Sequence, residues 1–407
     1  MNSFAYSDTS AVAKFDTLKK YHTIPEFRIG GDYDYSCIGD CLSGGVGGTT
    51  LESLGAGHLR TSWIELGSRH LDSDGEVDNA ILICPYYSGD STNMMDFWHF
   101  DGDRTDFSLG AQIGPGLLFD TDKYCILLFD AVGLWGSSRP GASMPGCENS
   151  VALGLEFPRY SVEDCVQAIY LTLTEHLGIK RLKLVTGVSF GATMTYCWSV
   201  MHPDFMEAIL PVGGTVFQDR GMIRWLFDLV TSAVQSDPVY RSTIGNYYHL
   251  PRSEWPVLGN MFAWSILKQS AFVDEYRITQ SHEQYILEAF DWNESMKTVQ
   301  AGGIEGGYSQ SLLEISRAID SNDLIYRNIC QSKFNVEEYL CRVKARALII
   351  HVDTDQWIRA HIARRAADGI SGAKLLTFDH DFGHYAVFRV PSLYKKEISD
   401  FIDPFID

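Results

Sequence analysis

Ser189 stands between two glycines in the run "GVSFG", a G-x-S-x-G spacing. A serine hydroxyl becomes a nucleophile when a nearby base takes its proton, and that base needs an acid to orient it. The spacing also fits a tight turn with no chemistry. The flanking residues favour chemistry, because an apolar run at 182–186 precedes the serine and a helical pattern from about Phe190 to Met201 follows it.

Two later loops contain the residue types that such a serine requires. Asp353 and Asp355 follow the apolar run "RALIIHV", and His380 and His384 follow the run "AKLLTF". The order serine, acid, histidine is the order found in α/β-hydrolases. Gly383 permits a tight turn that projects the next ring toward the sheet, which favours His384 over His380 as the base. These residues alone leave both aspartates open as the acid.

A tetrahedral intermediate at the serine would need two N–H donors for its oxyanion. In this fold one donor is the residue after the serine, here Phe190, and the other comes from the loop after an earlier strand. The corresponding loop is 85–90, "PYYSGD". Its composition also fits a turn exposed to solvent.

The surrounding elements predict an α/β fold with a mostly parallel central sheet, flanking helices and an inserted helical lid. Short apolar runs alternate with helical patterns, which indicates strands buried on both faces. Expected strands are at 79–84, 124–130, 182–186, 208–212, 346–352 and 373–378, and expected helices are at 162–177, around "IRAHIARRAADGI" and near 392–402. We expect a loop-rich N-terminal extension at 1–59, a catalytic core at 60–212 and 343–407, and a helical lid at 213–342.

Composition narrows the classes of function. The chain has 407 residues, a formal net charge of −19 and nine cysteines. A field of that sign repels phosphate backbones and anionic membranes, so we expect no nucleic-acid or membrane partner. The cysteines lie in apolar runs or lack ligand spacing, which predicts free thiols and no metal site. With no signal-like or membrane-spanning segment, a cytoplasmic location is expected.

Several motifs in order resemble those of homoserine O-acetyltransferases, α/β-hydrolase-fold enzymes that carry an acetyl group on a serine. The resemblance covers roughly residues 60–395 and includes "DNAILICPYYSGDS", "IGPGLLFDTDKYCILLFDAVGLWGSSRPG", "GVSFGATMTYCWSVMHPDF", "IIHVDTDQW" and "FGHYAVF". It implies that Ser189 is the nucleophile, His384 the base and Asp355 the orienting acid. It also assigns the oxyanion-hole N–H groups to Tyr87 and Phe190.

Other positions depart from the family. A lid arginine of the family corresponds to Thr231, another family arginine to Glu163, and its "RFDaNsYl" run to Gly306–Gln310. Arginine grips a carboxylate with two hydrogen bonds, so these departures argue against homoserine as the substrate. Candidate pocket residues are Tyr86, Trp225 and Thr231. Aromatic lid residues that could line an apolar pocket are Trp225, Phe227, Tyr247, Tyr248, Phe262 and Trp264.

The function expected from these features is a serine hydrolase that acts through an acyl-enzyme on an ester, thioester or lactone of a hydrophobic small molecule. One alternative is an O-acyltransferase that moves an acyl group from acetyl-CoA or another acyl-CoA to an alcohol other than homoserine. A second alternative is a ligand-binding protein without catalysis. No bound cofactor is expected, and the resemblance suggests a homodimer formed through the lid.

Overall fold

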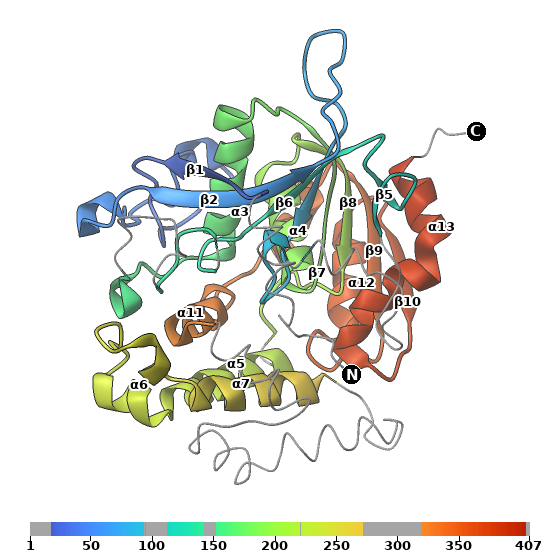
Figure 1. The fold of residues 1–407 in the computed structure, drawn as a ribbon. Coiled ribbons are helices and arrows are strands. Elements are labelled where there is room, and N and C mark those ends of the chain that lie inside the picture. Colours follow the sequence, from blue (N-terminus) through green and yellow to red (C-terminus); the bar gives the residue numbers. More distant parts are fainter. Residues whose placement is uncertain are drawn as a thin grey trace.

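The computed structural model describes residues 18–92, 94, 112–134, 136–141, 152–219, 221–271 and 319–403. Within these ranges an eight-stranded sheet forms the centre of the molecule, in the order β1-β2-β6-β3-β7-β8-β9-β10 (Figure 1). β2 pairs antiparallel with β1 and with β6, and all other neighbours are parallel. The strands are β1 (Lys20–Ile24), β2 (Leu59–Leu66), β3 (Ala80–Cys84), β6 (Cys125–Phe129), β7 (Leu182–Val188), β8 (Met206–Val212), β9 (Arg346–Val352) and β10 (Lys374–Phe378). A separate two-stranded sheet joins β4 (Ile113–Gly114) to β5 (Phe119–Asp120).

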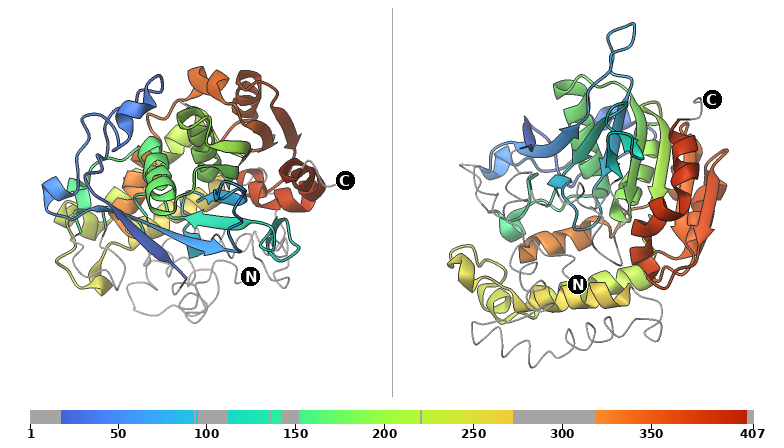
Figure 2. Two further views of the ribbon diagram at one scale, coloured as in Figure 1. Left: turned by 90° about the horizontal axis from the view of Figure 1, so that it is seen from above. Right: turned by 45° about the vertical axis from the view of Figure 1, so that its right-hand side comes forward.

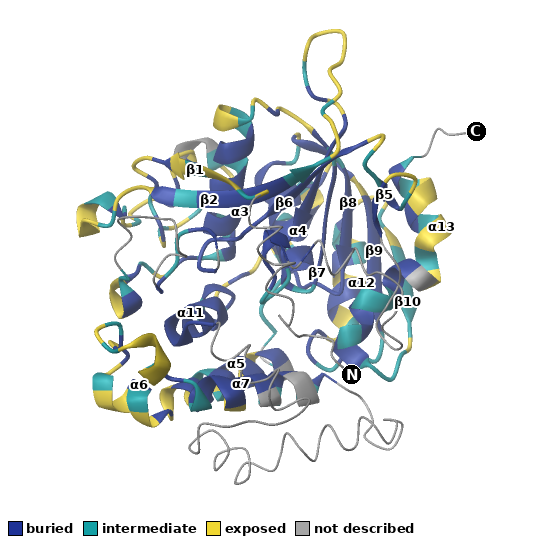
Figure 3. Cartoon of the chain, viewed as in Figure 1, coloured by how far each residue is buried: buried dark blue, intermediate teal, exposed yellow. Residues whose placement is uncertain are grey.

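The central strands β3 and β6 are apolar throughout because both of their faces are covered. Along β3, Leu82 belongs to one buried cluster, whereas Ile81 and Ile83 belong to the other. This alternation follows from the two-residue period of a strand. Buried residues accordingly fill the centre of the sheet (Figure 3). Helices α3 (Val162–Leu171), α4 (Phe190–Met201) and α12 (Ala360–Gly369) contribute to the first cluster, and α13 (Val390–Ile402) contributes to the second.

The prediction of a mostly parallel α/β fold is confirmed, and all six expected strands are present with small shifts of their ends. The helix expected to begin at residue 162 does so, and Ser161 and Asp164 form a reciprocal capping box at its start. Within the helix expected over 162–177, the α-helical part ends at Leu171, and a π-helical turn follows over Thr172–His176.

The antiparallel edge of the sheet was not among the expected elements. β1 lies inside the segment expected to be a loop-rich extension, and β2 begins at the boundary of that segment. Three of the five residues of β1 are exposed and only one is buried, so the strand lacks the continuous apolar run that marks the central strands. Part of the N-terminal extension is therefore built into the main sheet.

Helices between β8 and β9 form a cap over one end of the core. The α-helices in the described part of this interval are α5 (Met222–Gln235), α6 (Pro238–Thr243), α7 (Leu258–Ser270) and α11 (Ser321–Cys330). In Figures 1 and 2, α5 and α7 lie side by side in an outer layer, and α11 lies between this layer and the sheet. The candidate run Gly306–Gln310 lies outside the described residues.

Two further expectations concern cysteines and membranes. All eight cysteines within the described ranges are free thiols, and six of them are buried. Among the described helices, none has both the length and the apolar character that a membrane crossing requires.

Candidate active site

Ser189 lies at a sharp turn between β7 and α4. Its backbone has φ 55° and ψ −117°, a conformation that is strained for a residue other than glycine. A Cβ atom on Gly187 would lie 2.6 Å from the backbone of Gly191, and a Cβ on Gly191 would lie 2.4 Å from the carbonyl oxygen of Cys84. Both glycines are thus required by close backbone packing, and the turn presents the serine hydroxyl at the carboxyl end of the sheet.

The structure brings Ser189, His384 and Asp355 together in a hydrogen-bonded chain. His384 Nε2 lies 2.8 Å from Ser189 Oγ, and His384 Nδ1 lies 2.6 Å from Asp355 Oδ2. His384 and Asp355 are buried, with 2% and 4% of their surface exposed. These distances fit proton transfer from the hydroxyl to the ring, with the carboxylate holding the ring in its orientation.

Asp355 is fixed by the loop that follows β9. Its Oδ1 accepts hydrogen bonds from the backbone N–H groups of Trp357 at 2.7 Å and Ile358 at 3.0 Å. Oδ2 is thereby left to His384. The Trp357 ring stacks on the His384 ring, with centroids 4.5 Å apart, and its Nε1 donates to Ser270 Oγ. The carboxylate and the imidazole therefore have little freedom to reorient.

His384 itself is placed by a turn at Gly383, which has φ 47°. The backbone N–H of His384 donates to the carbonyl oxygen of Ala271, at the end of α7. Buried His351 lies close by, and burial lowers its pKa below the usual histidine range, so it adds no positive charge to this region at neutral pH.

The two rival residues lie outside this chain of hydrogen bonds. Asp353 forms an ion pair with Arg364. His380 Nδ1 accepts a hydrogen bond from the backbone N–H of Phe382. The geometry therefore selects Asp355 and His384, and the tight turn at Gly383 was the sequence signal that pointed to the latter.

The candidate oxyanion donors lie beside the serine turn. Phe190 is the first residue of α4, where a backbone N–H has no acceptor within the helix. Cys84, the last residue of β3, is in register with Gly187, and Pro85 O would lie 3.1 Å from a Cβ on Gly191. The loop that carries Tyr87 therefore passes directly against the start of α4. This placement agrees with the expected pair of donors, and their role remains a prediction.

Lys19, Asp90 and Asp130 form an ion cluster at the end of this loop, which was not predicted from the sequence. Lys19 Nζ lies 3.0 Å from Asp90 Oδ2 and 3.3 Å from Asp130 Oδ2, and all three side chains are at least nine-tenths buried. Burial opposes the charge on Lys19, but the two carboxylates outweigh it and raise its pKa. Asp130 also accepts hydrogen bonds from Ser62 Oγ and the Ser91 N–H. No spacing in the sequence links residue 19 to residue 90.

The candidate pocket residues have different environments. Thr231 Oγ1 accepts a hydrogen bond of 2.9 Å from Asn328, and the half-buried Tyr86 ring packs edge-on against Phe388. Trp225, by contrast, is 60% exposed on α5. An exposed tryptophan gives no direct support to the expected pocket, and its role there stays a prediction.

The lid aromatics are similarly divided. Phe262 is 40% exposed, whereas Phe227, Tyr247 and Trp264 are buried. The hydroxyl groups of Tyr247 and Tyr248 both donate to Asp320. These two tyrosines are therefore engaged in cap packing, and they give no direct support to an apolar substrate pocket.

Glu163 also has a different context from the one expected. Its carboxylate accepts a hydrogen bond from Tyr35 where the N-terminal segment meets α3. The neighbouring Asp164 accepts from Gly30 N–H and Tyr33 O–H at the same junction. Glu163 thus helps to anchor the N-terminal segment. The absence of an arginine at this position therefore says nothing about how the site would bind the carboxylate of a substrate.

Comparison with known proteins supports the resemblance seen in the motifs. No protein-family model matches the chain. A homoserine O-acetyltransferase of Haemophilus influenzae (strain 86-028NP) is 28% identical over 337 residues, which cover 80% of this chain and 89% of the relative. The chain is therefore similar to homoserine O-acetyltransferases over most of its length.

Solved structures of similar fold include both esterases and a transferase. The crystal structure of esterase E22 has a TM-score of 0.67 at 20% identity and covers 94% of this chain and 99% of its own. Homoserine O-acetyltransferase from Bacillus anthracis has a TM-score of 0.66 at 18% identity and covers 94% of this chain and 97% of its own. The chain is thus similar in sequence to homoserine O-acetyltransferases and similar in fold both to esterases and to a homoserine O-acetyltransferase.

Proposed function

We propose that this enzyme forms an acyl-enzyme on Ser189 and releases the acyl group to water, acting as an esterase on small acyl esters. The observation that carries the proposal is the continuous hydrogen-bonded chain from Ser189 Oγ through His384 to Asp355. Esterases among the proteins of similar fold support the same chemistry.

In the first step, His384 Nε2 takes the proton of Ser189 Oγ while the oxygen attacks the ester carbonyl carbon. The N–H groups of Phe190 and Tyr87 would stabilise the oxyanion, a contribution of about 3–4 kcal/mol for each donor in comparable sites. His384 then gives its proton to the leaving alcohol as the carbon–oxygen bond breaks. Asp355 stabilises the positively charged ring during both transfers.

In the second step, a water molecule takes the place of the alcohol. His384 removes a proton from the water as its oxygen attacks the acyl carbon, and then returns the proton to Ser189 Oγ as the acid leaves. The site needs no redox change, and all protons pass through the same ring nitrogen.

Homoserine is disfavoured as the acceptor by the described part of the cap. Thr231 stands where the family has an arginine, and its hydroxyl accepts from Asn328. Arg327 lies nearby, but it is 1% exposed and donates to the carbonyl oxygen of Val132. A substrate carboxylate therefore has no access to this guanidinium.

The test is to incubate the purified protein with a panel of p-nitrophenyl esters, and separately with acetyl-CoA with and without homoserine. We expect ester hydrolysis without any alcohol acceptor, and covalent labelling of Ser189 by a fluorophosphonate, located by mass spectrometry. Ser189→Ala should lose both, whereas Ser232→Ala, which removes an exposed hydroxyl of α5, should retain both.

Acyl transfer to an alcohol is the second candidate, and the similarity to homoserine O-acetyltransferases favours it. Consumption of acetyl-CoA that depends on an added alcohol, with little ester hydrolysis in water, would replace the esterase proposal by this one. Full activity of Ser189→Ala would rule out both.

A further inference from the structure

The two residues assigned to the oxyanion hole are both held through their side chains by one helix of the cap. The Tyr87 hydroxyl donates to Asn328 Oδ1. The Phe190 ring lies under the Arg327 guanidinium, with Cζ 4.6 Å from the ring centroid. Arg327 and Asn328 are consecutive residues of α11, so one turn of this helix contacts both sides of the site.

Tyr87 is restrained at its ring as well as at its hydroxyl. The ring stacks on Phe227 of α5, with centroids 5.8 Å apart and an angle of 14° between the planes. Asn328 Nδ2 donates in turn to Thr231 Oγ1 on the same helix. The Asn328 amide thus connects the loop after β3 to both α5 and α11.

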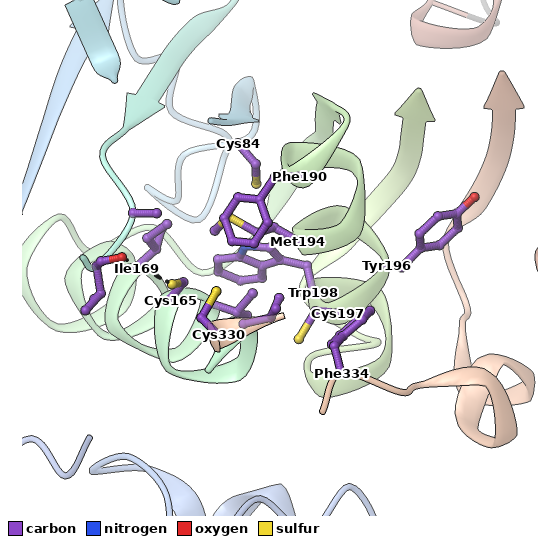
Figure 4. Packing of buried hydrophobic residues seen from close by; sticks show 14 of the residues in the cluster. Cys84, Cys165, Ile169, Phe190, Met194, Tyr196, Cys197, Trp198, Cys330 and Phe334 are labelled. Atoms are coloured by element: carbon purple, nitrogen blue, oxygen red, sulfur yellow. Dashed lines mark hydrogen bonds between the residues drawn. The ribbon is translucent and has the colours of Figure 1, made fainter. Parts of the chain in front are cut away.

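Phe190 is restrained from the opposite side. Its ring is 2% exposed and points into the buried cluster near Met194, Trp198 and Cys330 (Figure 4). Arg327 covers this ring and also lies over the Tyr160 ring, at 5.6 Å. A cation over an aromatic face is favourable when it is desolvated. Because the Phe190 side chain faces the core, it anchors its backbone N–H and does not contact a substrate.

We propose that Asn328 and Arg327 are positioning residues that set the separation of the two oxyanion donors, Asn328 through Tyr87 and Arg327 through Phe190. This inference rests on the proposed acyl-enzyme function. An oxyanion hole acts when its donors lie about 2.7–3.1 Å from the developing charge, so a small displacement of the loop weakens the transition state more than the bound substrate. In this proposal the cap acts on the catalytic step itself.

The experiment is a double-mutant cycle of Tyr87→Phe and Asn328→Ala, measured with p-nitrophenyl acetate and by the rate of fluorophosphonate labelling. Tyr87→Phe removes one hydroxyl and preserves the ring, which keeps the test valid if Asn328→Ala impairs folding. The matched control is Tyr326→Phe, which removes a hydroxyl from the same helix that donates to the carbonyl oxygen of Leu155.

We expect each single variant to lower kcat and the labelling rate about tenfold, less than the roughly 10²- to 10³-fold loss when an oxyanion donor is removed. KM should change by less than about twofold, because the oxyanion donors stabilise the transition state more than the bound substrate. The double variant should be no slower than the slower single variant, because both changes remove the same hydrogen bond. Tyr326→Phe should resemble the unmodified enzyme.

An unchanged kcat in Tyr87→Phe, or losses that add in the double variant, would overturn the inference. A rise in KM with constant kcat would also overturn it, because it would assign these residues to substrate binding. In each case Ser189→Ala must be inactive in the same assay. Activity that survives in Ser189→Ala would instead remove the proposed function, and the inference with it.

Discussion

The triad and the loop after β3 form two sides of one site, yet they are held in place by different means. Each triad residue lies at or after the carboxyl end of a parallel strand, and Asp355 is oriented by N–H groups only two and three residues along the chain. Two distant residues hold the loop at 85–90. Lys19, directly before β1, pairs with Asp90, and Asn328 of the cap accepts a hydrogen bond from Tyr87. Ser189 and Asp355 are fixed mainly by local backbone geometry, whereas the loop at 85–90 is fixed by contacts with distant segments.

This difference separates the residues that carry out the reaction from the residues that set the position of the oxyanion loop. A strand, a tight turn and a helix constrain the nucleophile whatever the cap does, because the close contacts at Gly187 and Gly191 leave one arrangement. The oxyanion loop instead depends on side chains from segments that can vary independently. Changes in the triad should therefore abolish catalysis with little loss of stability, whereas changes in the loop supports should affect both.

The largest effect on catalysis should come from Asp355→Asn. Asparagine Oδ1 would keep the two backbone N–H bonds, so its amide group would face His384 Nδ1 and donate to it. The ring would then carry its proton on Nε2 and could not accept one from Ser189. We expect kcat for ester hydrolysis to fall about 10³- to 10⁴-fold, with a nearly unchanged melting temperature.

The matched control for this variant is Asp353→Asn, two residues earlier in the same loop. Asp353 pairs with the exposed Arg364, and loss of such a pair costs only about 0–1 kcal/mol. Its kcat should stay within twofold. Similar losses in the two variants would show that the geometry has not identified the orienting acid.

An intermediate effect, shared between stability and activity, is expected for Lys19→Met. The variant removes the cation that Asp90 and Asp130 share in the buried cluster, which should lower the free energy of unfolding by about 3–5 kcal/mol. Activity measured below the melting temperature should also fall, because Asp90 belongs to the oxyanion loop. Urea unfolding and ester hydrolysis would measure the two effects.

Lys20→Met provides a comparison at the next residue of the chain. Lys20 pairs with Glu65 with about half of its side chain exposed (52%), so its removal should cost about 0–1 kcal/mol. Equal stability of the two lysine variants would contradict a stabilising role for the buried ion cluster of Lys19, Asp90 and Asp130.

The smallest effect should be a change in the pH dependence of stability in Asp164→Asn. Burial raises the pKa of Asp164 to about 7, against hydrogen bonds from Ser161, Tyr33 and Gly30 that lower it. The folded state then binds more protons than the unfolded state between about pH 4 and pH 7, so stability falls as pH rises through this window. The slope from one such group is at most about 1.4 kcal/mol per pH unit.

Asparagine can keep an acceptor for Gly30 and Ser161 and cannot ionise. The free energy of unfolding of Asp164→Asn, measured in urea at pH 5, 6, 7 and 8, should therefore decline less steeply than that of the unmodified protein. Asp74→Asn, which changes an exposed carboxylate, serves as the control. Parallel pH curves for all three proteins would show that Asp164 does not titrate in this range.

Much of the fold and the triad could be predicted because the relevant signals are short. Six strands had continuous apolar runs, and α4 began where the G-x-S-x-G run ended. The edge strand β1 carried no such run and was missed. Trp225 was predicted as a pocket residue from its type, and its 60% exposure on α5 could not be read from type or spacing alone.

The sequence by itself determined the order of the central strands and the helices between them, the tight turn at the serine, and the two late loops that carry Asp355 and His384. These features depend on residues within a few positions of one another, where backbone sterics and apolar periodicity act directly. The residue types left Asp353 and Asp355 open, the resemblance implied Asp355, and the tertiary structure places Asp355 against the histidine. Only the tertiary structure decided that Lys19 pairs with Asp90 and that α11 contacts Tyr87 and Phe190. Such contacts join segments separated by tens to hundreds of residues, and they arise from how the sheet and the cap pack against each other.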